Sequence, residues 1–84
     1  MFLNDFQFDV VAVMLNRDPP ADVNAPMDAL DLSELIYRQG FPGVADQAIG
    51  NMVEKGVLGW VLGKNQYYVT DAAAAAFNTA IQEG

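Results

Sequence analysis

The fold of this chain is decided by residues 32–70, whose sequence is LSELIYRQGFPGVADQAIGNMVEKGVLGWVLGKNQYYVT. The second helical segment in this stretch is the clearest, because its apolar residues recur at the i, i+3, i+4, i+7 and i+8 spacing of one helical stripe. These residues are Ala45, Ala48, Ile49, Met52 and Val53. The spacing predicts a helix over residues 44–55, which ends at a left-handed Gly56.

A β-hairpin is predicted directly after this helix. Residues 57–62 and 67–70 are rich in β-branched and aromatic side chains, which favour strands. The turn between them consists of Gly63, Lys64, Asn65 and Gln66. We interpret Trp60, Tyr67 and Tyr68 as core residues and cross-strand pairs; the alternative is an aromatic patch that binds a ligand.

The segment before residue 32 is predicted to hold a first helix and a loop. Asn4 and Asp5 offer an N-cap for a helix over residues 5–16. The apolar residues at helical spacing in this segment are Phe6, Val10, Val13 and Met14. Residues 17–26 carry three prolines, so we expect a loop within one domain rather than a linker between two.

Another helix is predicted over residues 28–39. Its inner stripe consists of Leu32, Leu35 and Ile36, extended at the start by Leu30. Asp28 or Asp31 provides the N-cap, and Gly40 lies past the last helical residue.

A final helix is predicted to begin after Thr70, which serves as its N-cap. The alanines of residues 72–76 have high helix propensity, and Phe77, Ala80 and Ile81 supply an apolar face. We expect this face to close the domain's own core against the first helix. The alternative is that terminal helices of two copies pair, which would give a homodimer.

Composition and charge exclude several kinds of site. The chain of 84 residues contains no cysteine and no histidine, so it lacks thiol nucleophiles, thiolate ligands and the commonest metal ligand. Four acids before and at the start of the second helix could suggest a cation site: Asp18, Asp22, Asp28 and Asp31. Their spacing matches no EF-hand loop. We therefore expect no metal, no cofactor and no enzymatic activity.

Hydropathy predicts a chain that does not enter a membrane. The longest nearly continuous apolar run, residues 10–15, is far shorter than the ~20 residues that a membrane-spanning helix requires. We expect a single domain over residues 1–84 that is located in the cytoplasm and has no membrane partner.

The whole pattern resembles the winged helix-turn-helix superfamily, particularly MarR-like regulators. The resemblance is carried by Leu32-Ser33-Glu34-Leu35, the Gly40 turn, residues 44–58 and Tyr68-Val69-Thr70-Asp71. It implies an α+β, mostly helical fold with three helices, a β-hairpin wing and a C-terminal helix. In such domains the second helix of the helix-turn-helix enters the major groove of DNA, while the wing touches the backbone or minor groove.

On this sequence the corresponding surface is the outward face of residues 44–55 together with the tip of the hairpin. The candidate partner-binding residues are Asp46, Gln47, Gly50, Asn51, Glu54, Lys64, Asn65 and Gln66. Gln47 and Asn51 have side chains that can bond adenine edges. Gly50, a glycine inside a helix, marks close approach either of a partner or of the preceding helix.

The charge balance favours a protein partner over nucleic acid. Eleven acids against four bases give a formal net charge of −7, and the four bases are scattered along the chain. Strongly salt-dependent DNA binders contact about 6 to 10 phosphates with basic side chains. The leading hypothesis is a small acidic regulator, adaptor or inhibitor that binds another protein, such as a phage-type inhibitor of a nucleic-acid-binding machine. The alternative is a DNA-binding transcriptional regulator.

Overall fold

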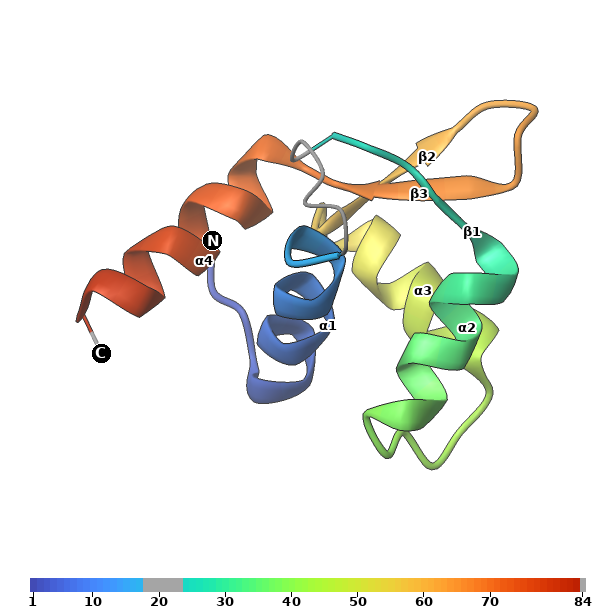
Figure 1. The fold of residues 1–84 in the computed structure, drawn as a ribbon, viewed down its shortest axis with the longest axis horizontal. Coiled ribbons are helices and arrows are strands. Elements are labelled where there is room, and N and C mark those ends of the chain that lie inside the picture. The colour runs from blue at the N-terminus through green and yellow to red at the C-terminus, as the bar shows by residue number, and fades with distance from the viewer. Residues whose placement is uncertain (18–23, 84) are drawn as a thin grey trace.

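Four helices and a three-stranded antiparallel sheet make up the computed structural model, which describes residues 1–17 and 24–83 (Figure 1). The predicted α+β class is confirmed. The elements in chain order are α1 (Asp5–Leu15), β1 (Met27–Asp28), α2 (Ala29–Arg38), α3 (Ala45–Glu54), β2 (Leu58–Val61), β3 (Gln66–Val69) and α4 (Asp71–Glu83). Figure 1 shows α1 between α4 and the α2–α3 pair, with β2 and β3 reaching past α3 at the upper right.

Helix α1 is capped by Asn4, as predicted, and the cap is a capping box with Gln7. The Asn4 side chain accepts the Gln7 N–H at 2.8 Å, and the Gln7 side chain accepts the Asn4 N–H at 3.0 Å. These two bonds satisfy N–H groups that a helix start leaves unpaired. Val10 and Met14 are buried as predicted, but Val13 is 42% exposed, because the buried stripe runs through Val11 instead.

Helix α2 presents its predicted stripe to the core, whereas the predicted extension at its start is wrong. Leu32, Leu35 and Ile36 are buried, but Leu30 is 83% exposed. Leu30 lies in the first turn of α2, two residues before the buried stripe starts and on another side of the helix. Gly40 adopts a φ of +82° directly after the helix, as predicted for its end.

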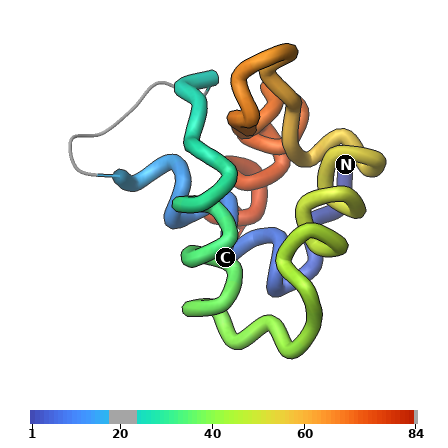
Figure 2. The backbone as a smooth tube through the Cα atoms, turned by 90° about the vertical axis from the view of Figure 1, so that its right-hand side faces the viewer, coloured from blue at the N-terminus to red at the C-terminus, as the bar shows by residue number. Residues whose placement is uncertain are grey.

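Helix α3 matches its predicted pattern closely. Its four buried residues are Ala45, Ala48, Ile49 and Met52, and Val53 packs against the core from its edge. Gly56 ends the helical segment with a φ of +79°. The N–H of Ala45, the first residue of α3, donates to the Tyr37 hydroxyl oxygen at 3.2 Å. A side chain from α2 therefore fixes the start of α3. Figure 2 shows α2 and α3 side by side below the hairpin.

Strand β1 is the element that the sequence did not predict. It contains two residues, and it pairs with β3 through Met27↔Tyr67 and Asp28↔Gln66, so the strand order is β1-β3-β2. The Gln66 amide donates to the Asp28 carboxylate at 2.8 Å. Asp28 is the N-cap residue of α2 by position, but neither it nor Asp31 gives that helix the predicted side-chain cap. Gln66 is likewise a strand residue and not part of the turn.

Helix α4 is capped as predicted and contributes to the core only through its first half. Thr70 Oγ1 accepts the Ala73 N–H at 3.2 Å and donates to the Gly56 carbonyl at 2.6 Å. The Phe77 ring packs on Phe8 with ring centroids 4.8 Å apart, which confirms closure of the core against α1. Ala80 and Ile81 are exposed, contrary to prediction, because the second half of α4 runs away from α1 (Figure 1).

Candidate functional site

The outward face of α3 is exposed along its whole length, as predicted. Asp46, Gly50 and Glu54 follow one another at i, i+4 and i+8, so they form one row along the helix. Gln47 and Asn51 form a second row beside it, farther round the exposed side. The two rows differ in chemistry: the first has a carboxylate at each end, and the second has two neutral amides.

A hollow separates the first of these rows from the hairpin. Its volume is ≈ 340 Å³, and we call it the α3–hairpin hollow. Its lining consists of Asp46, Ile49, Gly50, Val53 and Glu54 from α3, Trp60 from β2 and Tyr67 from β3. Ile49 is almost completely buried, whereas Trp60 is 53% exposed, so the apolar lining runs from the core out to the surface.

Trp60 is the residue of this lining whose burial the sequence predicted wrongly. It pairs with Tyr67 across the hairpin, as expected of a cross-strand pair, but it is not a core residue. Leu58 points to the same side of β2 and is 2% exposed. Trp60 lies two residues closer to the turn, where the hairpin has passed beyond the core.

Tyr68 does not belong to the same aromatic surface. It lies opposite Gly59 in the ladder, and its ring occupies the space where a Cβ on Gly59 would stand. Because side chains alternate along a strand, Tyr68 is on the opposite face of the sheet from Tyr67. The predicted alternative of an aromatic patch on the hairpin is therefore limited to Trp60 and Tyr67.

Gly50 lies between the two carboxylates of the hollow, and its surroundings are open. A Cβ added to Gly50 would meet no atom within 4 Å, so close packing against α2 does not explain this glycine. Asp46 and Glu54 are eight residues apart, which corresponds to roughly 12 Å along a helix axis. The rim of the hollow is thus negative at both ends and without a side chain in the middle.

The predicted residues of the hairpin tip separate into two groups. Lys64 and Asn65 are exposed in the turn, where Asn65 has a φ of +50°. The Asn65 carbonyl accepts the N–H of Ala29 at 3.0 Å, which attaches the turn to the start of α2. Gln66 is already engaged with Asp28, so its amide is part of the fold.

The four cations of the chain are spread over separate parts of the structure. Arg17 donates to the carbonyls of Ala25 and Pro26, and Arg38 is held by Glu34. The other two cations, Lys55 and Lys64, lie before and after β2, whose four residues span roughly 13 Å. The α3–hairpin surface therefore has a cation at either end of the hairpin and two carboxylates beside the hollow.

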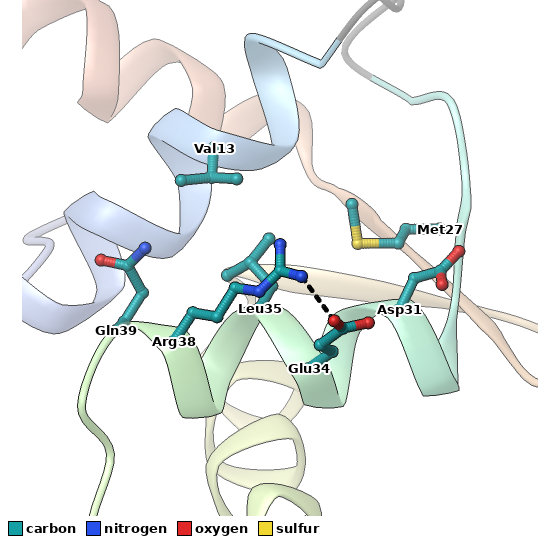
Figure 3. Close-up of a pocket in the computed structure, with 7 residues that line it drawn as sticks. All are labelled: Val13, Met27, Asp31, Glu34, Leu35, Arg38 and Gln39. Atoms are coloured by element: carbon teal, nitrogen blue, oxygen red, sulfur yellow. Dashed lines mark hydrogen bonds and ion pairs between the residues drawn. The ribbon is translucent and has the colours of Figure 1, made fainter.

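A second hollow of ≈ 300 Å³ lies between α1 and α2 (Figure 3). Its lining consists of Val13, Met27, Asp31, Glu34, Leu35, Arg38 and Gln39. The only cation in this lining, Arg38, is bonded to Glu34 at 2.5 Å, and both side chains are largely exposed. Exposed pairs of this kind contribute little free energy. Arg38 offsets one of the two acids in this lining, so Asp31 leaves one net negative charge here, against two at the α3–hairpin hollow.

Within residues 1–17 and 24–83, no group of three or more His, Cys, Asp or Glu side chains is arranged to hold a metal ion. Asp18 and Asp22, considered above for a cation site, lie outside the described residues. None of the helices in the described part of the chain has the length and apolarity that crossing a membrane requires.

Comparison with known proteins adds no relative to this description. No family model matches the chain, and no curated protein or solved structure matches it. The kind of partner that this site can bind follows from its own groups. These are an apolar lining with two aromatic rings and a rim with two carboxylates.

Proposed function

We propose that this chain is a winged-helix protein-binding domain that acts as a regulator, adaptor or inhibitor of its partner. The order of elements supports the winged-helix assignment: α2 and α3 form a helix-turn-helix pair, β2 and β3 follow as a hairpin, and α1 and α4 flank them. In this scheme α3 is the recognition helix and the hairpin is the wing.

The chemistry of the α3–hairpin surface is the observation that carries the proposal. A DNA reader neutralises several phosphates at this surface with lysine and arginine. Here Asp46 and Glu54 stand beside a half-exposed Trp60, and only Lys55 and Lys64 are nearby on the chain. Exposed aromatic side chains are enriched at protein interfaces, where they act as anchors. The surface therefore suits a protein better than a polyphosphate.

The net charge of −7 points to the kind of partner. A strongly acidic domain is attracted at long range to basic surfaces, and nucleic-acid-binding machines carry such surfaces. A chain of this kind would block the nucleic-acid site of its partner by occupying it. Inhibition of a nucleic-acid-binding machine is the form of the proposal that this charge favours.

One observation favours a second candidate, a DNA-binding transcriptional regulator. Gln47 and Asn51 are both exposed on α3, one turn apart, and such side chains can make paired hydrogen bonds to adenine in the major groove. This candidate requires a dimer or a basic partner, since one chain offers few cations for the backbone.

The two candidates are separated by measuring duplex DNA binding and protein capture with the same variants. We expect no association with random duplex at micromolar protein in ~50 mM salt, measured by fluorescence anisotropy. We expect the chain to capture a protein partner from its native host, identified by mass spectrometry. The charge reversals Asp46→Lys and Glu54→Lys together should abolish this capture.

A matched control uses two acids on other helices that do not line the α3–hairpin hollow. Asp9→Lys and Glu83→Lys make the same change in net charge at exposed positions on α1 and α4. Capture should survive this control. Binding of duplex DNA that depends on Asn51, with no protein captured, would overturn the proposal in favour of the second candidate.

A further inference from the structure

We propose that the α3–hairpin hollow binds a basic amphipathic helix, which places one large apolar side chain between Asp46 and Glu54 and against Trp60. This inference rests on the proposed function and names the chemistry of the partner's segment. Amphipathic helices dock in apolar grooves through the apolar side chains of one face, which act as anchors.

The lining of the hollow is suited to an apolar anchor. Ile49, Val53 and Tyr67 supply an apolar surface that continues the core, and Trp60 stands half exposed at the hairpin side. Burying the exposed half of a tryptophan ring is a characteristic gain of protein interfaces. The volume of ≈ 340 Å³ is near the lower limit of about 300–1,000 Å³ for ligand pockets, which suits a side chain better than a large cofactor.

Gly50 gives access to this lining from the surface. Glycine is unfavourable inside a helix, and here neither a positive φ nor a close neighbour requires it. Any larger residue at position 50 would place a side chain between Asp46 and Glu54, at the rim of the hollow. The glycine therefore keeps open the path that an anchor needs.

The rim charges determine the sign of the partner. Arg38–Glu34 is the one ion pair among the described residues, so Asp46 and Glu54 have no cation bound to them within that part of the chain. Glu54 is the last residue of α3, where the helix dipole disfavours an acid, so this carboxylate is not there to stabilise the helix. Two negative groups on either side of an apolar opening are complementary to a segment with cations on either side of an apolar residue.

The spacing of the two carboxylates fits a helical occupant. They are roughly 12 Å apart along α3, which is about two helical turns. A helix aligned with α3 would meet them with lysine or arginine one turn before and one turn after its apolar anchor. Nucleic acid would bring phosphates to the same two carboxylates and be repelled.

The single tryptophan of the chain provides a direct test, because it lines the hollow. The probe is a short helical peptide of alanine and lysine that carries one central leucine, with lysine one turn to each side. We expect the emission of Trp60 in the full chain to shift to shorter wavelength as the peptide is added. Replacement of the central leucine by alanine should weaken binding about tenfold.

Variants of the chain then locate the binding site. Asp46→Asn with Glu54→Gln should weaken binding of the peptide about tenfold, and Gly50→Leu should do the same by filling the opening. Asp9→Asn with Glu83→Gln, which removes the same charge elsewhere, should leave the affinity unchanged. Circular dichroism on each variant reports whether the fold is retained.

Several outcomes would overturn the inference. An unchanged Trp60 emission, or equal losses with both pairs of acid variants, would show that the hollow does not receive the helix. The same emission shift with duplex DNA would assign the surface to nucleic acid. The proposed function survives without this inference if Asp46→Lys with Glu54→Lys abolishes capture of the native partner while Gly50→Leu has no effect on it, and it fails if no protein is captured at all.

Discussion

The inner and outer halves of the hairpin follow the same side-chain alternation but differ in burial. Leu58 and Val69 face each other in the half next to α3 and are 2% and 1% exposed. Trp60 continues the same side of β2 toward the turn and is 53% exposed, and Leu62, at the start of the turn, is 80% exposed. The inner half is covered by helices, while the outer half extends past them (Figure 1). One apolar pattern therefore produces a core at one end and an accessible surface at the other.

The largest difference in stability is expected when one residue in each half of the hairpin is truncated to alanine. Leu58→Ala should lower the free energy of unfolding by about 2–5 kcal/mol, because it leaves a cavity in the core. Trp60→Ala should lower it by less than about 1 kcal/mol, since its side chain is half exposed. Urea unfolding followed by far-UV circular dichroism measures both. Equal losses would show that the outer half is also part of the core.

A smaller effect is expected at the junction that fixes the inner half. Thr70→Val keeps the shape of the side chain but removes the hydroxyl that bonds the Gly56 carbonyl and the Ala73 N–H. We expect a loss of about 1–2 kcal/mol in thermal unfolding, from a missing cap and an unpaired carbonyl. The control is Thr79→Val, at an exposed position of α4, where a change within about 0.5 kcal/mol is expected. If the two variants are equally stable, the hydroxyl of Thr70 does not hold the junction.

The smallest effect, of opposite sign, is expected beside the outer half. Gly50→Ala should raise the free energy of unfolding by about 0.5–1 kcal/mol, because a methyl group fits at this exposed helical position without contact. Gly56→Ala should lower it, because Gly56 has a φ of +79° that alanine adopts with strain. Chemical unfolding of both variants measures the difference in sign. A destabilised Gly50→Ala would indicate a structural role that its surroundings do not reveal.

Much of the fold was predictable, because local chemistry determines it. The stripe of α3, the left-handed Gly56 and the Thr70 cap depend on residues close in sequence, and each was found where its pattern predicts. Strand β1 was missed since two residues carry no periodicity, and Met27 is a strand residue only through its partner Tyr67 in β3. Ile81 was misassigned for a related reason: helical spacing gives the side of a helix but not where the covering neighbour ends. Leu30 was misassigned because it lies off the buried side of α2.

The candidate site was predictable only in part. Asp46, Gly50 and Glu54 were identified as exposed partners on α3, and they do line the α3–hairpin hollow. Trp60 was assigned to the core, with an aromatic patch as the alternative, because aromatic residues in a strand have the same sequence signal whether they lie over a helix or beyond it. Gln66, another predicted partner-binding residue, is bonded to Asp28 in a segment 38 residues away, which the local sequence does not indicate.

The sequence by itself determined the order of the elements, the inner face of α3 and the negative charge, because spacing, caps and composition act locally or over the whole chain. Only the tertiary structure decided that Trp60 and Tyr67 lie against the Asp46–Glu54 row, that Tyr68 lies on the other face, and that Arg17 and Arg38 are engaged elsewhere. These outcomes depend on contacts between residues far apart in the chain, whose distances are set by packing.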